Sequence, residues 1–270
     1  MSLIKQVSDS FTQARFKEEH RALLDLIGKG TKEKVELYLE KFPQAARWTF
    51  GPGHEYTAIH EAVMARRMEL IPLFQQYGVD INQPTRNGEP PVCWVHSKDE
   101  IGELVALGAT MDDPRWHGLT PLMRASIFAR ADEIEGLLAH GADPHKVIND
   151  PQNRFHGQTA LQIASSFTDD MGQDDMPCDR QAQAVKLLLA QGGHSVDELR
   201  RCCDLAGNWT ESAPAGKLLQ AALEQTEAAQ IAAAQAVIDD AAAEKKAIDT
   251  IVHGLPESTT VRRPLVLRKP

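Results

Sequence analysis

The chain has 270 residues, and its 42% hydrophobic, 25% charged and 6% aromatic residues are ordinary for a globular protein of one or two domains. The 38 acidic residues outnumber the 29 Lys and Arg residues, which gives a formal net charge of −9. A chain this acidic is not expected to bind nucleic acid through its phosphates. The sequence contains no stretch of 18 or more apolar residues, the length that a membrane span needs, so we expect no membrane partner.

The first twenty residues lack the apolar core of a signal peptide, and four cysteines are too few for a disulfide framework. We therefore expect a cytoplasmic protein with reduced thiols, and delivery into another cell by a dedicated secretion system stays open. Residues 1–49 are expected to form N-terminal capping helices. One helix ends near Gly28-Lys-Gly30, and the next follows Thr31 with an apolar face of Val35, Tyr38, Leu39 and Phe42.

Four segments then share one sequence frame, which we call copies 1 to 4. The clearest, copy 3, runs from Gly118-Leu-Thr-Pro-Leu-Met-Arg-Ala125 through Asp132-Glu-Ile-Glu-Gly-Leu-Leu138 to Gly141-Ala-Asp143. Copy 1 spans Tyr56–Asn82, copy 2 spans Gly88–Thr110 and copy 4 spans Gly157–Gly193. Copy 2 is three residues shorter than copy 3 between its opening and closing glycines, and copy 4 carries the acidic insertion 168–179. Internal repeats of this length indicate a repeat architecture.

Each copy is expected to form a pair of helices. Thr120 can cap the first helix of copy 3, and Pro121 stands where its missing N–H costs nothing. We expect the inward-facing residues of this pair to be Leu122, Ala125, Ile134, Leu137 and Leu138. A glycine follows the second helix of each copy, where the chain often takes the left-handed conformation that glycine adopts most easily. These glycines are Gly78, Gly108, Gly141 and Gly192. Because one such pair cannot bury its apolar face alone, neighbouring copies must stack.

This frame resembles the ankyrin repeat, whose pattern is G-x-T-P-L-H-x-A-A, a second helix with paired leucines, and then G-A-D-x-N. Copy 3 matches it closely, copy 1 well, and copies 2 and 4 in part. The resemblance implies an all-α fold: a solenoid of stacked helix pairs with short hairpin loops over residues 50–210, capped at both ends.

The rest of the chain is predicted to close the solenoid and extend from it. Residues 211–253 are expected to form a closing helix that continues as a long Ala-rich helix over 215–252, with Gly254 and Pro256 as stop signals. The small and apolar residues of this helix recur at alternating intervals of three and four residues for fewer than four heptads. We therefore expect either a monomer or a weak homodimer that forms through the Ala-rich helix. We expect a disordered basic tail at 254–270.

Candidate chemistry is sparse, and we predict no catalytic residues, no metal and no cofactor. His140 and His145 flank a Gly-Ala-Asp-Pro turn and are expected to face solvent. Cys202 and Cys203 lie in an amphipathic helix and are interpreted as buried small hydrophobes. The resemblance gives His60 a structural role, in which such a histidine bonds the backbone of a neighbouring repeat. The aspartates of the acidic insertion are interpreted as a solvated loop, with a cation or a basic partner as alternatives.

In the ankyrin family the ligand is usually held on the concave side, by hairpin tips and the surface of the first helices. The residues of this chain at those places are Arg86, Asn87, Trp116, His117, Ile127, Phe128, Phe155, His156 and Phe167. Four of them are large aromatics at positions that the framework does not require to be apolar, as is typical of binding hot spots. A shared zinc ion between the aligned His54, His117 and His156 is excluded, because helical repeats lie about 8–10 Å apart.

The favoured hypothesis is a non-enzymatic protein that binds another protein through this face, as an adaptor, inhibitor, bacterial effector or immunity-type protein. The alternatives are a self-assembling structural protein that uses the Ala-rich helix and, less favoured, an enzyme with an unrecognised site.

Overall fold

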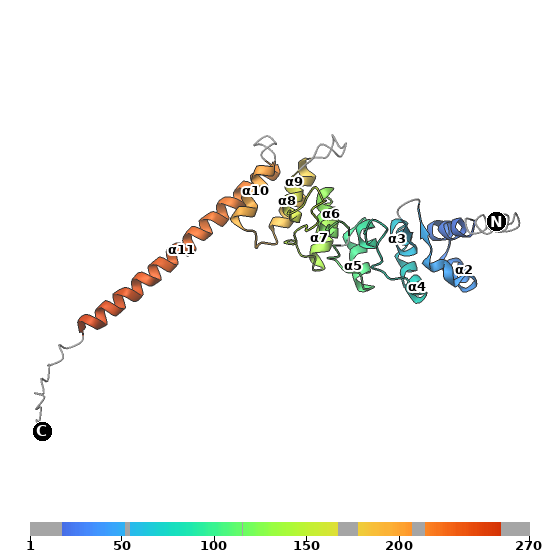
Figure 1. Cartoon of the computed structure of the whole chain (residues 1–270), viewed down its shortest axis with the longest axis horizontal. Coiled ribbons are helices and arrows are strands. Elements are labelled where there is room, and N and C mark those ends of the chain that lie inside the picture. The colour runs from blue at the N-terminus through green and yellow to red at the C-terminus, as the bar shows by residue number, and fades with distance from the viewer. Residues whose placement is uncertain (1–17, 52–54, 115, 167–177, 207–213, 255–270) are drawn as a thin grey trace, which may run out of the picture. The chain divides into compact units, whose positions relative to one another are not determined.

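The computed structural model describes residues 18–51, 55–114, 116–166, 178–206 and 214–254 (Figure 1). The chain divides into two compact units, residues 1–222 and 223–270. The described residues are mostly helical, as expected, and their named strands are the short antiparallel pair β1 (Thr49–Phe50) and β2 (Tyr56–Thr57). None of the described helices combines the length and the apolar character needed to cross a membrane.

Ahead of copy 1, a helix covers residues 18–29, followed by α2 (Lys32–Lys41) and the 3₁₀ helix η1 (Pro43–Arg47). α2 buries Val35 and Leu39 of its expected apolar face, while Tyr38 is only half-buried and donates its hydroxyl proton to the Glu19 carbonyl oxygen at 2.9 Å. Thr31 is the N-cap residue, although its hydroxyl forms no cap hydrogen bond. The predicted helical N-terminal segment is therefore present where it is described.

The four copies form helix pairs with one variation. Copy 1 contains α3 (Ala58–Met64), the 3₁₀ turn η2 (Met68–Leu70) and α4 (Ile71–Gln76); copy 2 contains the 3₁₀ helix η3 (Pro91–Trp94) and α5 (Lys98–Ala106). Copy 3 contains α6 (Pro121–Ile127) and α7 (Ala131–Ala139), and copy 4 contains α8 (Ala160–Ser165) and α9 (Cys178–Leu189). The deletion in copy 2 therefore shortens its first helix to a four-residue 3₁₀ turn.

A hydroxyl caps the first helix of three copies at the same place in the frame. Thr57, Thr120 and Thr159 each accept a hydrogen bond from the backbone N–H three residues later, at 3.3–3.4 Å. Ser195 does the same for the N–H of Glu198 at 3.1 Å, at the start of α10 (Val196–Ala206). α10 therefore begins like the first helix of a fifth copy. The glycines at 78, 108, 141 and 192 all have positive φ, which confirms the predicted ends of the second helices.

Within the first unit, helices contact the helices of the next copy in chain order. The first helices α3, η3, α6, α8 and α10 contact one another in sequence, and so do the second helices α5, α7 and α9. Pairs within a copy, such as α6 with α7 and α8 with α9, join the two rows. Figure 1 shows these helices following one another through the unit. This arrangement brings equivalent positions of neighbouring first helices together.

The core of copy 3 agrees with the predicted frame except at one leucine. Leu122, Ala125, Ile134 and Leu137 are buried, and Leu137 is 2% exposed. Leu138 is only half-buried, which corrects the expectation that both leucines lie in the core. α7 turns Leu137 inward and leaves Leu138 at the margin of the contact, since adjacent helical residues do not share a face.

The C-terminal helix α11 (Pro214–Gly254) confirms the single long helix predicted over 215–252. Ala215 and Leu219 near its start are buried, whereas every side chain from 228 to 248 is exposed. The predicted tail beyond 254 and residues 168–177 of the acidic insertion lie outside the described residues.

Candidate functional site

Aromatic rings and guanidinium groups form a continuous series of contacts along the first helices of copies 1 to 3 and the residues that flank these helices; we call this series the stacking ladder. The rings of Tyr56 and Trp94 meet edge to face, with centroids 5.3 Å apart. The guanidinium carbon of Arg124 lies 5.1 Å from the Trp94 ring centroid and 5.5 Å from that of Phe128. Arg130 completes the ladder at 5.0 Å from Phe128. Such cation–aromatic contacts are stabilising at these separations.

The repeat frame explains why these residues meet. Tyr56 precedes the capping Thr57, and Trp94 ends the shortened first helix of copy 2. Arg124 and Phe128 are four residues apart on α6 and its C-cap, a spacing that places two side chains on one face. Because the first helices of adjacent copies are in contact, these positions line up across three copies.

Arg124 is the unusual member of the ladder. Only 7% of the residue is exposed, and its Nε and Nη1 are buried without a hydrogen-bond partner among the described residues. The indole Nε1 of Trp94 beside it is unsatisfied in the same way. A buried polar group without a partner costs free energy, and a buried charge costs more. Two nitrogen atoms of Arg124 and the indole nitrogen of Trp94 are therefore left without an acceptor among the described residues, while the charge of Arg124 interacts with the Glu133 carboxylate.

A groove of about 420 Å³ lies next to the ladder, with Phe128 in its wall. It is lined by His96, the segment from Phe128 to Glu133, and the side chains of Arg180 and Gln183 from α9. Arg130 donates to the Glu133 carboxylate at 2.9 Å, and burial raises the pKa of that carboxyl group. Arg180 is exposed, so the groove offers a second cation close to an aromatic wall.

The predicted partner-binding residues fall into two groups. Phe128 and Ile127 are half-buried at the end of α6, and Phe128 belongs to both the ladder and the groove. The hairpin residues Arg86, Asn87, His117 and His156 are exposed, and Trp116 is half-buried in a β-bridge with Leu119. Arg86 lies 3.8 Å from Glu55, and His117 Nδ1 lies 3.6 Å from Asp150. In the described part of the chain, no ring contact or hydrogen bond joins Trp116 to Phe128.

Phe155 was expected to be an exposed anchor and is instead buried, with 7% of its surface exposed. The Asn153 side chain accepts its backbone N–H at 2.9 Å, and Arg154 covers the ring at 4.5 Å, so the loop folds over this residue. Phe167 lies outside the described residues. The aromatic cluster predicted from Trp116, Phe128, Phe155 and Phe167 is therefore wrong at Phe155.

Of the five members of the stacking ladder, only Phe128 was among the predicted binding residues. Trp94 was missed because the frame of copy 2 is shortened, and Arg124 because it stands inside a helix between core residues. The available signal was a charged residue directly before Ala125 in the T-P-L-x-x-A frame of copy 3.

Cys202 and His60 agree with their structural interpretation, whereas Cys203 is less buried than expected. Cys202 is fully buried, and burial raises its thiol pKa to about 12, which opposes a nucleophilic role; Cys203 is half-buried. His60 is buried and bonds the backbone of copy 2. His140 and His145 are exposed, as expected.

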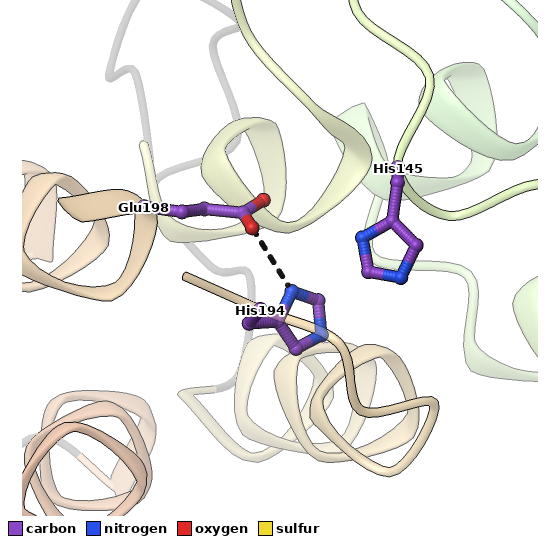
Figure 2. A group of neighbouring side chains, drawn as sticks. All are labelled: His145, His194 and Glu198. Carbon is purple, nitrogen blue, oxygen red and sulfur yellow. Dashed lines mark hydrogen bonds and ion pairs between the residues drawn. The ribbon is translucent and has the colours of Figure 1, made fainter. Parts of the chain in front are cut away.

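A second cluster joins His145, His194 and Glu198 (Figure 2). His194 Nδ1 lies 3.2 Å from Glu198 Oε2, and the His145 ring lies beside this pair with its centroid 5.0 Å from that of His194. The sequence analysis missed this group because His145 lies in an earlier copy, far along the chain from the neighbouring His194 and Glu198.

No protein-family model matches the chain. The residues and contacts described above are therefore the basis for a function.

Proposed function

We propose that this chain is an ankyrin-type repeat protein, not an enzyme, that binds another protein through the face carrying the stacking ladder. The in-register hydroxyl caps, the glycines that end the second helices and the two rows of helices support a solenoid of stacked pairs.

The observation that carries the proposal is the unsatisfied Arg124. Between Trp94 and Phe128, its guanidinium is shielded by aromatic faces, and its Nε and Nη1 atoms lack a hydrogen-bond acceptor among the described residues. Arginine with aromatic neighbours is the composition of binding hot spots, where a partner supplies the missing acceptor. A protein segment with a carboxylate or carbonyl oxygen next to an apolar side chain has the complementary chemistry. In the proposed complex, the partner's apolar side chain packs on Phe128, and its oxygen approaches the guanidinium of Arg124 after a small local rearrangement.

The groove beside Phe128 extends this surface. Arg180 is its exposed cation, whereas Arg130 is already paired with Glu133 and Asp132 also lines the groove, so a partner acid is expected to meet Arg180. The exposed hairpin residues Arg86, Asn87, His117 and His156, with Trp116, form a second part of the proposed surface at the tips.

The experiment is to capture partners with the full-length chain, identify them by mass spectrometry, and measure the Kd for purified variants. Phe128→Ala and Trp94→Ala are expected to weaken binding about thirtyfold, equivalent to about 2 kcal/mol for a hot-spot anchor. Trp116→Ala tests the tips separately. Leu37→Ala is the matched control, because Leu37 is an exposed apolar residue on α2, away from the ladder. Circular dichroism checks that each variant is folded.

Self-association through α11 is a second candidate. Ile231 and Ile238 are exposed and stand two helical turns apart, with the exposed Ala234 between them. A second copy of this helix covers such a stripe. Light scattering after size-exclusion chromatography tests this function: a dimer that Ile231→Asp with Ile238→Asp converts to monomer supports it, and a monomeric wild type opposes it.

A further inference from the structure

We propose that His145, His194 and Glu198 bind a divalent transition-metal ion of the Zn²⁺ class. One ligand atom from each residue can be chosen so that all three lie within 4.8 Å of one another. In a zinc site the ligand atoms, each about 2.0–2.2 Å from the ion, lie closer to one another than this limit of 4.8 Å. The ion therefore requires an inward shift on the order of 1 Å, and the exposed His145 is the residue free to make it.

The surroundings of His194 already select which nitrogen faces the ion. Its Nε2 lies 3.1 Å from the Leu188 carbonyl oxygen, so Nε2 carries the proton and donates it there. This leaves Nδ1 on the side of Glu198, at 3.2 Å from Oε2. A metal-binding histidine usually donates its other ring N–H to a backbone carbonyl or carboxylate in this way, which fixes the tautomer and the ring orientation.

Glu198 is oriented by a comparable contact. The Thr159 hydroxyl donates to Glu198 Oε1 at 2.6 Å and so holds one carboxylate oxygen in place. The other oxygen, Oε2, is the one directed toward His194 Nδ1 (Figure 2). His194 and Glu198 therefore each use one polar atom in a hydrogen bond to the surrounding protein. The other polar atom of each, Nδ1 and Oε2, is directed toward the proposed ion.

The third proposed ligand, His145, lies against Gly193. The backbone N–H of His145 donates to the Asp143 side chain at 2.9 Å, which shapes the loop that carries it. A Cβ on Gly193 would stand 3.1 Å from His145 Nε2, so a side chain there would push the ring away. Gly193 also has a φ of +74°, which disfavours any other residue. His145 is exposed, so a water molecule can complete the coordination shell from the solvent side.

The three ligands lie in different parts of the repeat array. His145 follows copy 3, His194 follows copy 4, and Glu198 belongs to α10. The ion thus ties the end of copy 3 to the start of the closing segment. Imidazole and carboxylate ligands suit Zn²⁺ and its neighbours in the first transition series, and binding releases any proton shared between His194 and Glu198.

The test uses the full-length chain freed of metal with a chelator and then titrated with Zn²⁺ or Co²⁺. We expect one ion per chain and, with Co²⁺, the visible absorption of a low-coordinate site. Glu198→Gln keeps hydrogen-bonding atoms but removes the anionic ligand, and His145→Ala removes the exposed ligand. Each is expected to weaken binding at least tenfold, whereas His156→Ala, which removes an exposed histidine elsewhere, leaves it unchanged.

Three results overturn the proposal: wild type that takes up no ion, His145→Ala that binds as tightly as wild type, or His156→Ala that loses as much affinity as His145→Ala. Any of them means that His194 and Glu198 form an ion pair only. If Glu198→Gln fails to fold by circular dichroism, His145→Ala decides the question alone, because His145 is exposed and its loss disturbs no core contact.

Discussion

The Nε2 atom of His60 in copy 1 lies 3.0 Å from the carbonyl oxygen of Glu89 in copy 2. The Thr57 backbone N–H donates to His60 Nδ1 at 3.1 Å, so the neutral ring accepts on one nitrogen and donates on the other. One buried side chain thus caps its own helix and joins two neighbouring copies.

This arrangement predicts that stability falls in mild acid. Burial lowers the pKa of His60 to about 4, below the value of 6.5 usual for histidine. Between these two pH values the unfolded chain binds a proton that the folded chain does not, so the contribution of His60 is complete above pH 6.5 and is lost as pH falls toward 4. The loss from this residue is roughly 3 kcal/mol of unfolding free energy.

Urea unfolding at several pH values between 7 and 4 measures the effect. His60→Gln is the control, because the equivalent Gln162 of copy 4 already accepts the N-cap N–H of Thr159 at 3.1 Å and does not titrate. The variant is expected to have a flatter pH profile than wild type. Parallel profiles for the two proteins would show that His60 does not govern this pH range.

The two leucines of α7 are expected to differ in their effect on stability. Leu137→Ala removes a buried side chain and is expected to cost about 2–5 kcal/mol of unfolding free energy. Leu138→Ala is expected to cost clearly less, because that side chain is half-buried. Chemical denaturation of both variants checks this order. Equal losses, or a loss below about 1 kcal/mol at Leu137, would contradict the repeat frame.

Arg124→Met is expected to separate stability from binding. Replacing a buried charge with an apolar side chain of similar length is often neutral or stabilising, and the thioether still packs against Trp94 and Phe128. We expect the unfolding free energy to stay within about 1 kcal/mol of wild type or to rise, while partner affinity falls. A destabilisation of more than about 2 kcal/mol would instead assign Arg124 to the fold.

The sequence was most informative where local chemistry determines the structure. The threonine caps and the glycines after the second helices act within one turn of the chain, so Thr120 and Gly141 could be placed from their neighbours alone. The burial of Phe155 could not, because it depends on how the loop around Asn153 folds over the ring. Neither the Trp94–Arg124 contact nor the His145–His194 contact has a local signature, since each forms only when separate copies are brought together.

The affinity of the captured partner for Phe128→Ala, compared with wild type and Leu37→Ala, tests the proposed binding face most directly. Phe128 contacts both arginines of the ladder and lines the groove, whereas Leu37 is 67% exposed on α2. The proposal predicts a loss of about thirtyfold for Phe128→Ala and unchanged affinity for Leu37→Ala, with both variants folded. A folded Phe128→Ala variant that binds as tightly as wild type would contradict it.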